Sequence, residues 1–178
     1  MRLASKSFYS YCSIIFIVFN LSWAVSGCQI LSSTSQQSRF IETPAAVGSQ
    51  FPYLSSLPDG SMLMSWVEAQ SNYHVLKFAI YQQDRWIRLG AAAQGSEWYV
   101  NWADYPAVVA IDNAFWVAHW RVKSKTGQVY DYDVFFSISV DAGATWSKPH
   151  KPYQEDIPVA HGFVSVFPAL GEAGMVWL

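Results

Sequence analysis

Short runs of alternating apolar and polar residues follow one another along most of this chain, separated by turn-forming residues. The apolar runs Ser61 to Trp66 and Ala114 to Trp120 each follow an Asp-Gly or Asp-Asn pair, the usual signal of a tight hairpin. After residue 25 no long apolar stretch has a 3.6-residue period, so no helix is predicted there. The pattern predicts an all-β fold built from antiparallel hairpins, and the nine Trp residues suit such packing.

One hairpin pattern occurs three times. Its copies begin at Phe51-Pro52, Tyr105-Pro106 and Phe167-Pro168, so the leading aromatic residues are 54 and 62 residues apart. The first two copies close on a Trp that lies 15 residues after the leading aromatic residue, and the third is predicted to turn at Gly171 to Gly174. Further strands are predicted at His74 to Gln82, Trp86 to Ala92, Tyr130 to Ser139 and Trp146 to Pro149. The spacing indicates repeated units of about four strands each.

The amino terminus predicts export. Arg2 and Lys6 precede an apolar run from Ile14 to Val25, which is too short to span a bilayer and has the length of a signal-peptide core. The next residues, Val25-Ser-Gly-Cys28, resemble a bacterial lipobox, in which Cys28 becomes the lipidated first residue. An ordinary secretory signal with a chance cysteine is the alternative. Gln29 is compatible with a place on the periplasmic face of the outer membrane, and the Ser/Gln-rich residues that follow predict a solvated tether.

Charge and cysteine content exclude several functions. The chain has 11 basic and 13 acidic residues, and two of the basic ones, Arg2 and Lys6, precede residue 28, so the processed chain would carry a net charge of −4. Nucleic acid is therefore not an expected partner. Cys12 lies in the predicted signal and Cys28 is predicted to be lipidated, so no thiol chemistry is expected. No two His have metal-ligand spacing, and neither a metal nor another cofactor is expected.

Residues 139 to 146 read Ser-Val-Asp-Ala-Gly-Ala-Thr-Trp, which resembles the Asp box, S-x-D-x-G-x-T-W, of sialidase-type β-propellers. Asp141 can accept backbone N–H bonds across a tight turn, and Gly143 can adopt a conformation in which a Cβ would clash. The fixed positions of the box are Ser139, Asp141, Gly143, Thr145 and Trp146. The resemblance implies a sialidase-like β-propeller of about six blades, in which the box is structural and lies on the face away from the substrate channel.

The repeats and the resemblance together define a domain plan. It comprises a signal peptide at 1–27, a tether at 28–48 and an incomplete propeller at 49–178, with blades at about 49–100, 101–160 and 161–178. About two and a half blades are too few to close a ring, so the chain is expected to be the amino-terminal part of a longer propeller.

The loops after the second and fourth strands of each blade surround the channel mouth in such a propeller. Asp104 and His161 are the candidate catalytic residues there, and the candidate substrate-binding residues are Glu68, Trp102, His119 and Arg121. Asp104, beside Trp102 and Tyr105, could be partly desolvated, as a general acid requires. The nearly isosteric change Asp104→Asn is then expected to affect activity and spare stability.

Structural alternatives exist for the same residues. Asp104 could bond turn amides, His119 could fill a core between tryptophans, and Arg121 could pair with Asp131 or Asp133. The family's first carboxylate-clamping arginine would lie just before the first inner strand, where this chain reads Ser49-Gln-Phe-Pro52, and Glu68-Ala-Gln-Ser-Asn72 occupies the place of the family's catalytic Asp.

The lipobox and the Asp-box resemblance together imply a lipid-anchored protein that acts on a carbohydrate of the cell envelope or periplasm. Exo-glycoside hydrolysis is one hypothesis. A non-catalytic propeller that binds glycans or scaffolds an envelope assembly is the other.

Overall fold

The structure, a computed structural model, describes residues 38–124, 128, 131–154 and 160–178. The predicted signal peptide, the lipidation site Cys28 and the first part of the tether lie outside the described residues. The chain divides after Ile41, and the strands belong to the unit from Glu42 to Leu178. They are β1 (Gln50–Ser56), β2 (Met62–Ala69), β3 (His74–Gln82), β4 (Arg85–Gly95), β5 (Ala107–Ala110), β6 (Trp116–Lys123), β7 (Tyr132–Ser139), β8 (Ser165–Ala169) and β9 (Glu172–Val176).

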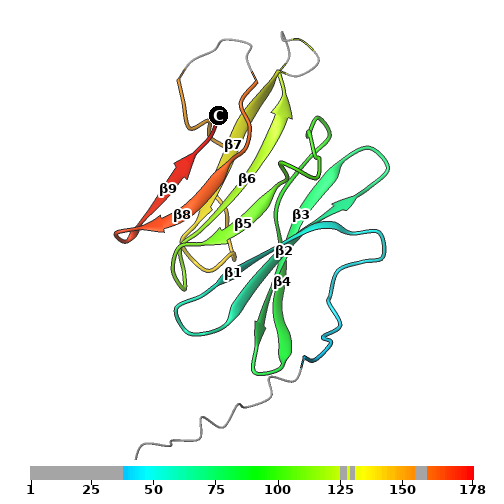
Figure 1. The fold of residues 1–178 in the computed structure, drawn as a ribbon, viewed down its shortest axis with the longest axis vertical. Coiled ribbons are helices and arrows are strands. Elements are labelled where there is room, and N and C mark those ends of the chain that lie inside the picture. The colour runs from blue at the N-terminus through cyan, green and yellow to red at the C-terminus, as the bar shows by residue number, and fades with distance from the viewer. Residues whose placement is uncertain (1–37, 125–127, 129–130, 155–159) are drawn as a thin grey trace, which may run out of the picture. The chain divides into compact units, whose positions relative to one another are not determined.

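The described residues contain strands and no helix, so the predicted all-β class is confirmed (Figure 1). In the same residues no helical segment is long and apolar enough to pass through a bilayer.

Three antiparallel sheets form, each from strands that follow one another in the chain. The first has the order β1-β2-β3-β4, the second β5-β6-β7, and the third is the hairpin β8-β9. Residues 147–150 extend the second sheet beyond β7, because Ser147 N donates to Ile138 O at 2.9 Å and Phe136 and His150 exchange two backbone bonds at 2.9 Å. With this segment the second sheet has four extended segments, as the first sheet does.

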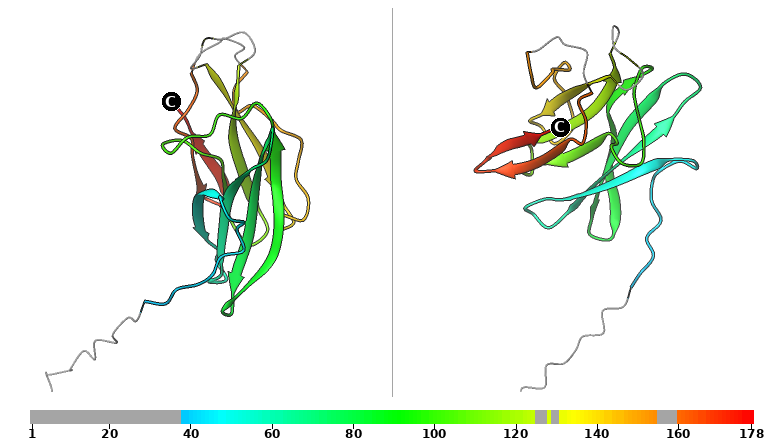
Figure 2. Two further views of the ribbon diagram at one scale, coloured as in Figure 1. Left: turned by 90° about the vertical axis from the view of Figure 1, so that its right-hand side faces the viewer. Right: turned by 45° about the horizontal axis from the view of Figure 1, so that its top comes forward.

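The first and second sheets meet through β5, which contacts β1, β2 and β3 (Figure 2). Two β5 amides donate across this interface, Val108 N to Ser65 Oγ and Ala110 N to Ser55 Oγ, each at 3.0 Å. The leading aromatic residues of the first two repeats, Phe51 and Tyr105, stack with ring centroids 5.7 Å apart. Equivalent positions of the repeat thus lie side by side in the fold.

Strand β6 is buried on both faces because the second sheet has a neighbour on each side. Trp116, Ala118 and Trp120 point into the core shared with the first sheet. Val117 alternates with them and packs with Val166 of β8 in a second core. A strand covered on both sides reads as a continuous apolar run, which explains why Ala114 to Trp120 lacks strict alternation.

One hairpin turn differs from the sequence prediction. The third hairpin turns at Leu170 and Gly171, both with positive φ, rather than at Gly171 to Gly174. Gly174 lies inside β9, where a Cβ would come within 2.5 Å of the Phe167 ring. Between β3 and β4, Gln83 and Asp84 both have positive φ and close a two-residue hairpin.

The boundary of the folded unit also differs from the predicted one. The tether was predicted to continue to residue 48, but the compact unit begins at Glu42. The Trp86 indole donates to Glu42 O at 2.6 Å, and Ala45 packs against Met64 and Trp66. These contacts cover the face of the first sheet that points away from the second sheet.

Candidate functional site

The predicted structural turns and the predicted site residues lie at opposite ends of β6. At the Trp116 end, Asp59 N donates to Asn113 Oδ1 at 3.3 Å and Ala142 N donates to Ala114 O at 2.9 Å. The two Asp-led hairpin turns and the Asp-box turn are therefore neighbours. Arg121 lies near the other end of the strand, with Asp104 and Gly162.

The Asp-box turn is closed by its own side chains. The Asp141 carboxylate accepts from Thr145 N at 2.9 Å, Thr145 Oγ1 at 2.6 Å and Ser139 Oγ at 2.7 Å. Ser139 Oγ in turn accepts from Gly143 N at 2.8 Å. The Thr145 hydroxyl and amide, followed by the Ser139 hydroxyl, lower the pKa of Asp141 to about 2.

This turn also joins the first and second sheets. Gly143 has φ +79°, and a Cβ there would lie 2.6 Å from both the Phe78 and Trp116 rings. Trp146 packs against Phe78 with centroids 6.0 Å apart. Arg88 of β4 donates to Ala142 O at 2.8 Å. Ser139 is buried and Gly143 and Trp146 pack between the two sheets, while Asp141 and Thr145 close the turn at the surface.

At the opposite end, a buried ion pair joins Asp104 to Arg121. Arg121 Nε lies 3.0 Å from Asp104 Oδ2, and Arg121 Nη2 donates to Asp104 O at 3.1 Å. The backbone amide of Phe163 donates to the same Asp104 Oδ2. Burial lowers the pKa of the Arg121 guanidinium, and the Asp104 charge opposes that effect. Arg121 thus pairs with Asp104 rather than with Asp131 or Asp133.

Local backbone geometry positions both members of the pair. Asn101 Oδ1 accepts from Ala103 N at 2.8 Å and Asp104 N at 2.9 Å, which fixes the loop before β5. A Cβ on Gly162 would lie 2.7 Å from Asp104 Oδ2 and 2.8 Å from Arg121 Nη1. Glycine at this position therefore leaves the room that the ion pair occupies.

Two tyrosines complete the surroundings of the guanidinium. The Arg121 Cζ lies 4.7 Å from the Tyr99 ring centroid and 5.3 Å from that of Tyr132, and the two rings stack 3.9 Å apart. Sequence analysis missed both tyrosines. Tyr99 precedes the candidate Asn101–Asp104 loop, but only its backbone pairing with β6, through Tyr99 N to Arg121 O at 3.0 Å, brings it to the site.

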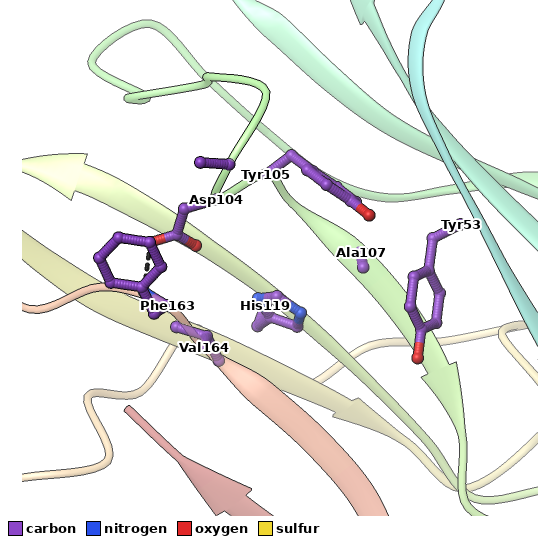
Figure 3. A pocket seen from close by; sticks show the side chains of 8 residues that line it. Tyr53, Asp104, Tyr105, Ala107, His119, Phe163 and Val164 are labelled. Atoms are coloured by element: carbon purple, nitrogen blue, oxygen red, sulfur yellow. Dashed lines mark hydrogen bonds between the residues drawn. The ribbon is translucent and has the colours of Figure 1, made fainter. Parts of the chain in front are cut away.

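A cavity of about 250 Å³ lies beside the ion pair (Figure 3). All three sheets or their flanking loops contribute to its lining, which consists of Tyr53, Ala103, Asp104, Tyr105, Ala107, His119, Phe163 and Val164. A second cavity, of about 410 Å³, lies on the Arg121 side and shares Ala103, Asp104 and Phe163 with the first.

His119 projects from β6 to the first cavity and is 5% exposed. Burial, with a smaller contribution from the Arg121 charge, lowers its pKa from 6.5 to about 4. The imidazole is therefore neutral at pH 7. A neutral ring can both donate and accept one hydrogen bond.

We expect the protein to lose stability as the pH falls from about 6.5 to about 4, because the unfolded chain then binds a proton at His119 that the folded chain does not. A shift of this size corresponds to about 3 kcal/mol when complete. Urea unfolding across this pH range measures the loss, and His119→Gln should remove that part of it. Parallel curves for the two proteins would contradict the prediction.

The remaining predicted residues lie away from the two cavities. Glu68 accepts from the Trp66 indole at 2.9 Å and pairs with Lys77 at 2.8 Å. Trp102 is 85% exposed, so it does not desolvate Asp104 as predicted, and the burial of Asp104 comes with Arg121 and Phe163 instead.

His161, predicted as catalytic, stacks on Tyr153 with centroids 4.1 Å apart, and its buried Nδ1 has no hydrogen-bond partner. It directly precedes Gly162 but lines neither cavity. Of the six predicted site residues, three are therefore brought to the ion pair and the cavities, namely Asp104, His119 and Arg121.

Within the described ranges no three His, Cys, Asp or Glu side chains form a group that could hold a metal ion. Comparison with known proteins adds no relative, since no family model, curated protein or solved structure matches this chain. The fold alone therefore gives the structural class of the protein. It is an all-β chain whose antiparallel sheets pack against one another in chain order.

Proposed function

We propose that this chain forms part of a β-propeller whose channel binds a carbohydrate without cleaving it. The observation that carries the proposal is the cavity to which β1, β5, β6 and the loops before β5 and β8 contribute, with Tyr53, Tyr105 and His119 in its lining. In a propeller the leading strands of successive blades surround the central channel. The serial packing of the sheets and the Asp-box octet Ser139 to Trp146 support that architecture.

The lining suits a sugar. Aromatic rings offer apolar faces for the C–H groups of a pyranose, while the tyrosine hydroxyls and the neutral imidazole offer hydrogen bonds to its hydroxyl groups. Pockets that combine aromatic walls with a few polar groups are typical of small-molecule sites.

The contacts of Asp104 favour binding over hydrolysis. Glycosidases generally use two carboxyl groups on either side of the scissile bond, about 5 to 9.5 Å apart. Among the residues that the structure describes, Asp104 is the one Asp or Glu in the lining of either cavity, and its Oδ2 already contacts Arg121 and Phe163 N. The Asp104 carboxylate therefore stabilises the buried Arg121 charge and the backbone at Phe163.

Sialidase-like exo-glycoside hydrolysis is the second candidate. It is favoured by the burial of a carboxyl group at a cavity wall, the environment from which a general acid acts. The predicted export signal and the resemblance of residues 25–28 to a lipobox support a place on the periplasmic face of the outer membrane for either function, and an envelope glycan as the ligand.

Screening the full chain on an array of glycans, followed by calorimetry with each sugar that binds, tests the proposal. Tyr53→Ala should weaken binding at least about tenfold because it removes a cavity wall. Tyr73→Ala is the matched control, since Tyr73 is 37% exposed and lines neither cavity. Absence of binding to any glycan, or equal losses in both variants, would refute the proposal.

The nitrophenyl glycosides of those same sugars test hydrolysis. We expect no release of nitrophenol above the rate without protein. Turnover that disappears in Asp104→Asn while sugar binding persists would establish the second candidate instead.

A further inference from the structure

The cavity beside Asp104 differs in charge from a site that captures an acidic sugar. Within the described residues no Lys or Arg lines the 250 Å³ cavity, and Arg121 lines only the second one. Its Nε lies 3.0 Å from Asp104 Oδ2, its Nη2 donates to Asp104 O, and the rings of Tyr99 and Tyr132 flank the guanidinium. Arg121 therefore presents no pair of N–H donors to a ligand carboxylate in this cavity.

The groups that do face the cavity favour a ligand without charge. The side chain of Asp104 is part of the lining, and the rings of Tyr53, Tyr105 and His119 lie on other sides of the space (Figure 3). A ligand carboxylate placed there would leave water without gaining a cation as partner, because Arg121 is paired with Asp104, and it would meet the negative faces of aromatic rings. His119 supplies no positive charge at pH 7, because burial keeps the ring neutral.

A positively charged ligand is also disfavoured. The negative charge of Asp104 is matched by Arg121 at 3.0 Å, so a cation that left water would gain no uncompensated partner. Hydroxyl groups pay the smallest cost of leaving water and can bond to tyrosine hydroxyls and imidazole.

From this arrangement we infer that the cavity selects a neutral sugar and rejects sugars that carry a carboxylate, such as sialic and uronic acids. This inference rests on the proposed function, because it specifies the class of carbohydrate that the same cavity takes. It sets the chain apart from the carboxylate-clamping chemistry that its Asp-box resemblance implies.

Calorimetric titration of the full chain with matched probe pairs tests the inference: lactose against sialyllactose, and methyl glucoside against methyl glucuronide. The neutral member of a bound pair should bind at least about tenfold more tightly at pH 7. Its affinity should also stay constant between low and high salt, since no charge pair forms.

The outcomes separate the two proposals. Equal or tighter binding of the acidic member would overturn the inference and leave carbohydrate binding standing. An affinity for the neutral sugar that falls steeply with salt would also overturn the inference. If none of the probes and none of the arrayed glycans binds, the proposed function itself fails.

Discussion

Asp104→Asn is expected to lower the free energy of unfolding by about 3 to 5 kcal/mol, because it leaves the buried Arg121 charge without its partner. The side chain of Arg121 is 9% exposed and that of Asp104 is 5% exposed, so water cannot replace the lost carboxylate. Urea unfolding of the full chain measures the change. From the sequence alone the same variant is expected to spare stability, and the ion pair reverses that expectation.

Two further variants make the Asp104 prediction specific. The double variant Asp104→Asn/Arg121→Met should recover part of the loss, because an apolar pair has no unpaired charge to bury. Asp133→Asn is the matched control, since Asp133 pairs with Lys151 at 3.1 Å in a more exposed place and should cost about 1 kcal/mol or less. An Asp104→Asn loss no larger than that of Asp133→Asn would contradict the buried ion pair.

Gly143→Ala is expected to cost about 2 to 4 kcal/mol. The added Cβ would lie 2.6 Å from the rings of Phe78 and Trp116, which overpacks the interface between the first two sheets. The residue would also be held at φ +79°, which disfavours any side chain. Thermal and urea unfolding measure the loss.

Gly60→Ala separates the two parts of the Gly143 effect. Gly60 has φ +82° in the turn between β1 and β2, and its added Cβ would meet no atom within 4 Å. It should therefore cost only the backbone strain, about 1 to 2 kcal/mol. If both alanine variants lose the same stability, the Asp-box turn does not pack against Phe78 and Trp116 as described.

Local signals in the sequence determined the hairpins of this protein. Asp59-Gly60 and Asp112-Asn113 mark turns by backbone chemistry that needs no tertiary contact, and the predicted strand His74 to Gln82 matches β3 residue for residue. The octet from Ser139 to Trp146 is equally local, because Ser139, Asp141 and Thr145 bond one another. Such features depend on neighbours within a few residues.

The third hairpin shows where local signals were insufficient. Glycines at 171 and 174 are equally good turn residues by composition, and the choice between them followed from the register of β8 with β9. The segment from Glu42 is not predicted from the sequence for a similar reason, because it has no strand pattern of its own and its contacts are with Trp86 and the face of the first sheet that it covers.

The candidate site was decided by packing between sheets. The sequence identifies Asp104, His119 and Arg121 as polar residues in suitable loops and strand ends. It also predicts that Trp102 lies against Asp104, but in the structure Trp102 is exposed to solvent. Residues 17 positions apart become an ion pair only when the loop before β5 lies against β6. Burial on both faces of β6 then fixes the charge of His119. The sequence by itself determined which segments turn and pair, since those choices depend on nearby residues. The tertiary structure alone decided which polar groups lose water and which partners they gain, because both depend on how the sheets stack.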